Sequence, residues 1–404
     1  MKYIVLLGDG MADWPLDELG GKTPLGVAHK PYMDGLAKRS VLGMVNTVPD
    51  GMPAGSDVAN LSVFGFDPKE FYTGRSPLEA LSMGIRLTDE DIAMRCNLVT
   101  LSNAEHYEDA TMLDYSAGEI TTSEASALIK SVAKGLNGNG FTFNPGISYR
   151  HCLVWKMGNL DMQLTPPHDI SGKPIKSFLP KGTNSELILD LMKRSTHILK
   201  DHPINQKRIE NGLNPATSIW LWGQGKKPAI PLFIEKYGLC GTVISAVDLI
   251  RGIGKASGMQ SIEVEGATGN IHTNFKGKAL AALGAIKEGR DFVYIHVEAP
   301  DECGHQGQLK DKIRAIEMID RDVLGTLLDG LDPDDETSIL VLPDHPTPIA
   351  TKTHCSDPVP YMIYRSGSEV MDENAVYTED YIRSRGNHHI EHGYTLMDRF
   401  LEQK

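Results

Sequence analysis

Six carboxylate or imidazole side chains follow three short apolar runs, at residues 3–8, 292–297 and 339–342. These side chains are Asp9, Asp301, His305, Asp344, His345 and His354. Aspartate supplies charge and oxygen, and neutral imidazole supplies nitrogen, so the set suits a divalent metal ion. Asp301 and His305 are four residues apart, and one helical turn could direct both at one ion. The sequence therefore predicts a metal site.

The elements that must position these residues are strands of an α/β sheet. Apolar, β-branched runs of this length are typical of buried parallel strands, and ligands bind beyond the carboxyl ends of such strands. Strand and helix patterns alternate near both ends of the chain, whereas residues 89–215 contain two alternating strands around a helix. We expect an α/β core with a mostly parallel central sheet flanked by helices, formed by residues 1–88 and 216–404. A smaller α+β domain, residues 89–215, is expected as an insertion.

Ser56 allows two interpretations. It follows Gly55 where a helix pattern begins, so it could cap that helix. It could also be a nucleophile whose hydroxyl is deprotonated by a metal ion, with helix N–H groups facing a phosphate. No Gly-x-Ser-x-Gly elbow surrounds it, which disfavours an esterase triad. The residues alone leave both roles open.

Arg75, Arg95 and Arg150 are candidate substrate-binding residues, because guanidinium binds phosphate bidentately. An ordinary exposed arginine is the default explanation for each. His388, His389 and His392 cluster near the C-terminus. They could bind metal, but a solvated surface helix explains them more simply, and their role stays open.

The overall composition excludes several classes of protein. The formal charge of −13 over 404 residues argues against general nucleic-acid binding. No apolar stretch approaches the roughly 18 residues of a membrane span, and the N-terminus lacks the features of a signal peptide. The five cysteines form no CxxC pair, which fits a reducing cytoplasm. We expect a cytoplasmic protein without a membrane or nucleic-acid partner, and of unspecified oligomeric state.

Several motifs occur in the order of one known family. They lie at residues 7–13, 55–60, 74–80, 94–97, 266–269, 301–305, 344–345 and 353–354. With them the chain resembles the archaeal type of cofactor-independent (2,3-bisphosphoglycerate-independent) phosphoglycerate mutase, of the alkaline phosphatase superfamily, nearly end to end.

This resemblance implies a phosphatase-like core with two divalent metal ions and an inserted lid that binds substrate. Manganese is the metal most often implied, with magnesium, zinc and cobalt as alternatives. One ion would be held by Asp9, Ser56, Asp344 and His345, and the other by Asp301, His305 and His354. Ser56 would be phosphorylated and dephosphorylated in turn. The implied reaction interconverts 3-phosphoglycerate and 2-phosphoglycerate in glycolysis and gluconeogenesis, so the partner would be a small phosphorylated substrate.

Two positions depart from the family pattern. Glu119 and Trp222 stand where the archaeal mutases carry arginine. A related bacterial branch, assigned as homoserine kinase of threonine biosynthesis, also lacks those arginines. A homoserine kinase-like phosphotransferase is therefore the main alternative. Sulfatase or phosphodiesterase chemistry fits the Ser56 motif less well, and a catalytically silent metal-binding protein is the non-enzyme alternative.

Overall fold

The computed structural model describes residues 1–385 and 388–402. It divides into two compact units: unit 1 comprises Met1–Tyr72 and Ile230–Lys404, and unit 2 comprises Thr73–Ala229. The sequence-based boundaries, at 88/89 and 215/216, both fall inside unit 2. Helix α5 (Arg75–Ser82) accounts for part of this difference, because it packs against strands β3 (Ile92–Leu101) and β9 (Ser218–Lys226) of unit 2.

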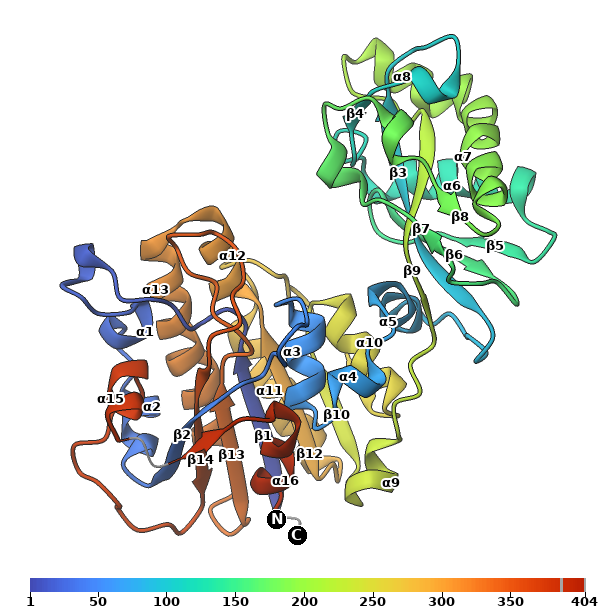
Figure 1. Ribbon diagram of the computed structural model, residues 1–404. Helices are drawn as coiled ribbons and strands as arrows, with labels where there is room; N and C mark the ends of the chain where they lie inside the picture. The colour runs from blue at the N-terminus through green and yellow to red at the C-terminus, as the bar shows by residue number, and fades with distance from the viewer. Residues whose placement is uncertain (386–387, 403–404) are drawn as a thin grey trace. The chain divides into compact units, whose positions relative to one another are not determined.

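Unit 1 is built on an eight-stranded sheet with the order β11-β10-β12-β1-β13-β14-β2-β15 (Figure 1). Its strands are β1 (Lys2–Gly8), β2 (Ser40–Val45), β10 (Gly241–Ile244), β11 (Gln260–Ile262), β12 (Phe292–Val297), β13 (Thr337–Leu342), β14 (Val359–Arg365) and β15 (His389–Ile390). Strand β14 runs antiparallel to both of its neighbours, and the other pairings in this sheet are parallel. The three apolar runs become β1, β12 and β13, side by side at the centre. The predicted fold class is confirmed.

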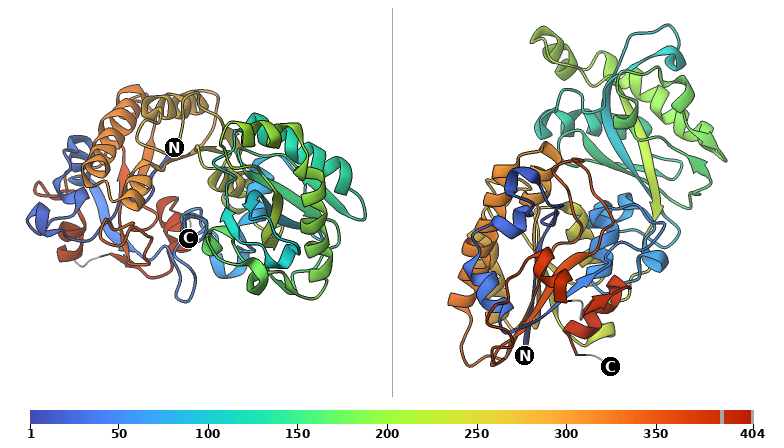
Figure 2. Two further views of the ribbon diagram at one scale, coloured as in Figure 1. Left: turned by 90° about the horizontal axis from the view of Figure 1, so that it is seen from above. Right: turned by 60° about the vertical axis from the view of Figure 1, so that its left-hand side comes forward.

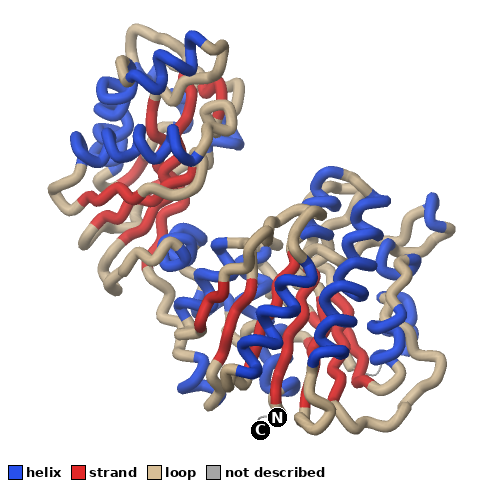
Figure 3. Tube along the Cα trace, turned by 180° about the vertical axis from the view of Figure 1, so that it is seen from behind, coloured by secondary structure: helices blue, strands red, loops and turns tan. Residues whose placement is uncertain are grey.

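Helices cover both faces of this sheet (Figures 2 and 3). Alternate residues of β1, such as Ile4 and Leu6, share one core with helices α2 (Pro31–Ala37), α11 (Phe275–Lys287) and α13 (Leu309–Met318). On the opposite face Tyr294 stacks on Phe64, which follows helix α3 (Ser56–Val63). The other helices of unit 1 are α1 (Pro24–Val27), α4 (Pro68–Phe71), α9 (Phe233–Tyr237), α10 (Asp248–Ala256), α12 (Ala299–Gln306), α14 (Thr326–Gly330), α15 (Glu379–Arg385) and α16 (Leu396–Phe400).

Residues 309–330 are helical throughout, because a π-helical segment, Ile319–Gly325, joins α13 to α14. One local expectation differs from the structure. The surface helix expected around His388, His389 and His392 is wrong: His389 lies in β15, which pairs with β2, and residues 386–387 just before it lie outside the described range.

Unit 2 is an α+β fold with its own core. Strand β3 pairs antiparallel with β9 on one side and with β4 (Met112–Asp114) and β6 (Arg150–Trp155) on the other, and β5 (Phe141–Asn144) pairs with β6. Helix α6 (Thr122–Leu136) and helix α7 (Ser185–Lys200) bury their apolar stripes against this sheet. Unit 2 also contains α8 (Pro203–Glu210) and the small β7–β8 pair (Met162–Gln163 and Lys181–Gly182). In the described part of the whole chain, no helix has the length and apolar character needed to cross a membrane.

Candidate active site

The site residues gather where β1, β12 and β13 end. The parallel register aligns Gly8 with Val297 and Leu7 with Leu342, so the three strands stop at nearly the same level. Asp9 follows β1 directly, helix α12 carries Asp301 and His305, and Asp344 and His345 lie just beyond β13. Gly10, with a φ of 60°, turns the chain away, and a Cβ there would lie 2.6 Å from Asp301 Oδ1. Only glycine fits this turn without displacing Asp301.

The predicted ligand residues form linked triplets. The three triplets are Asp301–His305–His354, Asp9–Asp301–His345 and Asp9–His296–Asp344. In each triplet, every residue offers one possible ligand atom, and these three atoms lie within 4.8 Å of one another. Shared Asp9 and Asp301 join the triplets into one cluster. The structure therefore brings all six residues expected from the strand ends into one place.

The histidines present free Nε2 atoms to this cluster. His305 Nδ1 lies 3.0 Å from the Lys352 carbonyl and His354 Nδ1 lies 3.1 Å from the Ala54 carbonyl, so each Nδ1–H donates to the backbone. Their Nε2 atoms are then left facing each other at 2.8 Å, beside Asp301. Two lone pairs at that distance require a proton or a cation between them.

His345 has the same tautomer for a different reason. The Thr347 hydroxyl donates to Asp301 and therefore accepts from His345 Nδ1 at 3.3 Å. His345 Nε2 is left 3.2 Å from Ser56 Oγ and 3.6 Å from Asp9 Oδ1. The Nε2 lone pair thus points at the hydroxyl and the carboxylate together.

The charges of the cluster fit a bound cation. Burial, and then the neighbouring charges of Asp344 and Asp301, raise the pKa of Asp9 well above its usual range. Asp9 Oδ1 is buried and has no hydrogen-bond partner among the described residues. Burial would also raise the pKa of Asp301, but hydrogen bonds to His305 and His354 hold it well below its usual range. Buried carboxylates this close are costly unless a cation compensates them, so the donor set fits divalent metal.

Ser56 is the first residue of α3, and Gly55 occupies the N-cap position. Its hydroxyl faces His345 as described above. One turn later, the Asn60 amide donates to the Ser56 carbonyl and to Asp344 Oδ2, both at 2.8 Å. The hydroxyl therefore lies at the edge of the carboxylate and imidazole cluster, where a phosphoryl group held by metal could reach it.

Three residues of this site were missed by sequence reasoning. His296, Asn60 and Thr347 all contact the predicted ligands. His296 lies inside an apolar run and Asn60 inside a helix, where neither residue type signals a site. Their contacts depend on strand register and loop path, and a pattern of residue types does not encode these.

The three predicted arginines lie in unit 2. Arg95 Nε donates to Glu79 at 2.7 Å, and Arg75 Nε lies 3.4 Å from the same carboxylate. Arg150 is placed separately, with its guanidinium 5.7 Å from the Tyr149 ring centre. Glu79, which sequence reasoning did not single out, thus engages two of the three expected anion-binding groups.

Trp222 lies beside one of these arginines, and Glu119 acts electrostatically on Tyr149. The Arg95 guanidinium is 4.6 Å from the Trp222 ring centre, and the Trp222 indole donates to Asn97 at 3.0 Å. Burial raises the pKa of Tyr149, and Glu119 is among the charges that act on it. The register pairs Arg95 with Trp222 and Asn97 with Arg150. Paired residues, and residues two apart on a strand, share a face, so these two pairs lie on one face of the sheet.

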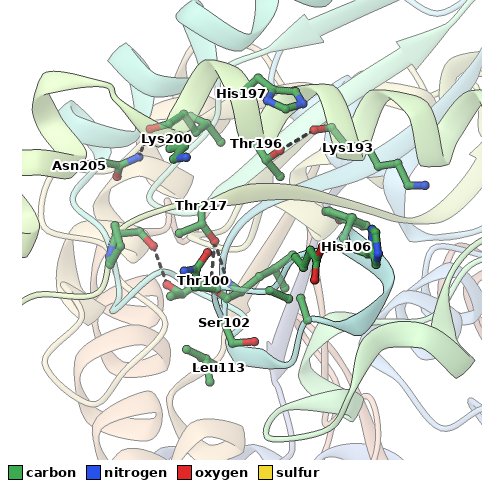
Figure 4. A pocket seen from close by; sticks show the side chains of 18 of the residues that line it. Thr100, Ser102, His106, Leu113, Lys193, Thr196, His197, Lys200, Asn205 and Thr217 are labelled. Carbon is green, nitrogen blue, oxygen red and sulfur yellow. Dashed lines mark hydrogen bonds between the residues drawn. The ribbon is translucent and has the colours of Figure 1, made fainter.

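Unit 2 also contains a cavity of about 810 Å³ (Figure 4). Helix α7 contributes Lys193, His197 and Lys200 to its wall, and Thr217, just before β9, lines it as well. None of the three predicted arginines is among its lining residues. This cavity is separate from the polar sheet face just described.

The fold and the site together define a metal-dependent phosphotransferase. The family model described as 2,3-bisphosphoglycerate-independent phosphoglycerate mutase matches residues 37–205. A relative from Geobacter sulfurreducens, named probable 2,3-bisphosphoglycerate-independent phosphoglycerate mutase, is 50% identical over 403 residues and 100% of both chains. A Methanosarcina barkeri protein named as such a mutase is 50% identical over 383 residues, 94% of each chain.

Solved structures agree with these relatives. The PH0037 protein from Pyrococcus horikoshii has a TM-score of 0.82 and 31% identity, covering 100% of this chain and 98% of that one. The cofactor-independent phosphoglycerate mutase from Thermoplasma acidophilum has a TM-score of 0.67 and 25% identity, covering 100% and 99%. The chain belongs to the family of 2,3-bisphosphoglycerate-independent phosphoglycerate mutases.

Proposed function

We propose that this protein interconverts 3-phosphoglycerate and 2-phosphoglycerate through a phosphorylated Ser56. The observation that supports this most is the convergence of a serine hydroxyl with six carboxylate and imidazole ligands at one sheet edge, in a chain half identical to named mutases. The family and the composition also favour a cytoplasmic enzyme of glycolysis and gluconeogenesis that acts on a small phosphorylated substrate.

The ligand set divides between two divalent ions, for which manganese is our first choice. Asp9, Ser56, Asp344 and His345 would hold one ion, and Asp301, His305 and His354 would hold the other. Bound there, such ions supply positive charge that neutralises phosphoryl oxygens and lowers the pKa of the Ser56 hydroxyl.

The residues of the chain then carry out two transfers. Ser56 Oγ gives up its proton and forms a bond to phosphorus while the bond from phosphorus to the substrate oxygen breaks, and that oxygen takes up a proton in exchange. The other hydroxyl of the same glycerate next loses its proton and bonds to phosphorus, the bond from phosphorus to Ser56 Oγ breaks, and Ser56 Oγ takes up a proton again. Unit 2, with Arg75, Arg95 and Arg150, would bind the glycerate and exclude water, because water would otherwise hydrolyse the phosphoserine.

The test is formation of 2-phosphoglycerate from 3-phosphoglycerate with added Mn²⁺, followed by mass spectrometry of the peptide that contains Ser56. We expect turnover and a phosphoserine at Ser56. The Ser56→Ala variant should lose both while still binding metal somewhat more weakly. If Ser56→Ala turned over substrate at the wild-type rate, Ser56 would have only a structural role.

A second acceptor remains a candidate because of the carboxylates in unit 2. Glu79 pairs with Arg75 and Arg95, and Glu119 acts on Tyr149, so carboxylates as well as guanidinium groups belong to this part of unit 2. Such a face suits a substrate with an ammonium group, such as homoserine. Activity with homoserine plus a phosphoryl donor, and none with 3-phosphoglycerate, would replace the mutase proposal by this one.

A further inference from the structure

His296 contacts the site from inside the sheet. It lies on β12 with 0% of its side chain exposed, and its Nε2 is 2.9 Å from Asp9 Oδ2. Its Nδ1 is 3.2 Å from the Ser245 hydroxyl. His296 is also close enough to Asp9 and Asp344 to be a metal ligand itself, so geometry must decide between ligand and support.

The hydrogen bonds around His296 fix its tautomer. In the ionised form that a bound cation requires, the Asp9 carboxylate can only accept, so His296 Nε2 carries the proton that it donates. The Val247 amide donates to Ser245 Oγ at 2.9 Å, which leaves the Ser245 hydroxyl proton to point at His296 Nδ1. This is the opposite arrangement from His305, His345 and His354, whose Nδ1–H groups donate away from the cluster and whose Nε2 atoms face it.

The two oxygens of Asp9 have different surroundings as a result. Oδ2 accepts from His296, whereas Oδ1 has no hydrogen-bond partner among the described residues and lies 3.6 Å from His345 Nε2. One oxygen is thus fixed by the protein, and the other is presented together with a free imidazole nitrogen.

Tyr294, two residues earlier on the same face of β12, supports the other carboxylate through Asn60. The Tyr294 hydroxyl donates to Asn60 Oδ1 at 2.6 Å, and the Asn60 amide donates to Asp344 Oδ2 at 2.8 Å. Tyr294 and Asn60 are both 0% exposed. Asn60 therefore has its acceptor occupied by Tyr294, so only its NH₂ group can face Asp344.

We propose that Tyr294 and His296 are positioning residues, which hold the carboxylates of Asp344 and Asp9 in the orientation that metal binding requires. The inference rests on the proposed function, since it takes Asp9 and Asp344 as ligands. Partners of this kind, behind the ligands, commonly change metal affinity about 10- to 100-fold when removed.

The first experiment follows the imidazole protons of His296 by ¹H–¹⁵N NMR of full-length protein, metal-free and with Zn²⁺, a diamagnetic ion. We expect His296 to keep its proton on Nε2 in both states, while His345 and His354 show metal coordination at Nε2. Loss of the Nε2 proton of His296 on adding Zn²⁺ would make it a ligand and overturn the inference.

The second experiment measures Mn²⁺ affinity by calorimetry for His296→Leu, His296→Gln and Tyr294→Phe. We expect a 10- to 100-fold weaker Kd for His296→Leu, a smaller loss for His296→Gln because glutamine keeps a donor near the Nε2 position, and a measurable loss for Tyr294→Phe. His151→Leu is the matched control, because His151 is a buried strand histidine of unit 2 with its Nδ1 bonded to the Gly146 amide. It should bind Mn²⁺ like the wild type.

The outcomes separate this inference from the proposed function. Wild-type protein that binds no Mn²⁺ at this site would overturn the proposed function, and the inference with it. Wild-type binding that is unchanged in both His296→Leu and Tyr294→Phe would overturn the inference alone. Tyr294→Phe removes a single oxygen from a stacked ring, so it tests the idea even if His296→Leu does not fold.

Discussion

At the scale of single residues, the site is organised by where each imidazole proton lies. His305, His345 and His354 each direct Nδ1–H at an oxygen outside the cluster. Their Nε2 atoms therefore converge with Asp9 and Asp301. Hydrogen bonding to Asp301, partly opposed by burial, raises the pKa of His305 to about 9. Metal and proton compete for the same nitrogen.

This competition predicts how the protein responds to pH. The folded pKa of His305, about 9, lies above the unfolded value of about 6.5. Its protonation therefore stabilises the metal-free fold fully below pH 6.5, and this stabilisation is lost as the pH rises through 9. We expect the Tm of metal-free protein to fall over this range while the affinity for Mn²⁺ rises, with proton release on binding.

The measurements are Tm by calorimetry and Mn²⁺ affinity in buffers of different ionisation enthalpy. His305→Gln should flatten both dependences. An Mn²⁺ affinity that stays constant from pH 6.5 to 9 in the wild type would show that His305 holds no competing proton.

At the scale of elements, helix α13 joins two of the loops that carry the candidate ligands. Lys312 is fully buried, and its Nζ donates to Asp13 at 2.8 Å, to the Thr347 carbonyl at 2.8 Å and to the Ala12 carbonyl at 3.2 Å. The loop after β1 and the loop after β13 are thereby held on one ammonium group.

We expect Lys312→Met to destabilise the protein by about 3–5 kcal/mol, because Asp13 is left buried without its cation. The double variant Lys312→Met/Asp13→Asn should recover part of this loss. Urea unfolding of metal-free protein provides the measurement. Lys38→Met is the control, since the Lys38–Glu373 pair is exposed and its loss should cost less than about 1 kcal/mol. Equal destabilisation by both single variants would contradict the assigned role of Lys312.

The sequence predicted individual strands and helices better than it predicted contacts between them. Apolar runs and turn residues were enough to predict β1, β12 and β13 and the cluster of candidate ligands just beyond them. Two features could not be predicted from the sequence. One is the packing of α5 on β3 and β9, which places the start of unit 2 at residue 73. The other is the ion pair between Glu79 and Arg95. Both depend on contacts between segments distant in the chain, and composition carries no record of them.

At the scale of the whole molecule, the two units have separate hydrophobic cores. Unit 2 is one continuous segment whose strands pair only with one another among the described residues. The cluster of candidate ligands belongs entirely to unit 1, and the three arginines belong to unit 2. The proposed chemistry therefore assigns phosphoryl transfer to one unit and substrate selection to the other.

This division predicts that residues 73–229 fold when expressed alone. Because their core is complete, the fragment should unfold cooperatively in urea and show dispersed amide NMR signals. A fragment of residues 1–72 should remain unfolded, since the partners of β1 are absent from it. An unfolded 73–229 fragment would mean that unit 2 depends on contacts with the rest of the chain.

The central place of β1 also has a consequence for synthesis in the cell. β1 is among the first residues made, yet its neighbours β12 and β13 begin at Phe292 and Thr337. At about 5–20 residues per second, a ribosome needs tens of seconds to supply them. During that interval the apolar β1 segment of the nascent chain has no strand to pair with, so we expect chaperones to bind it.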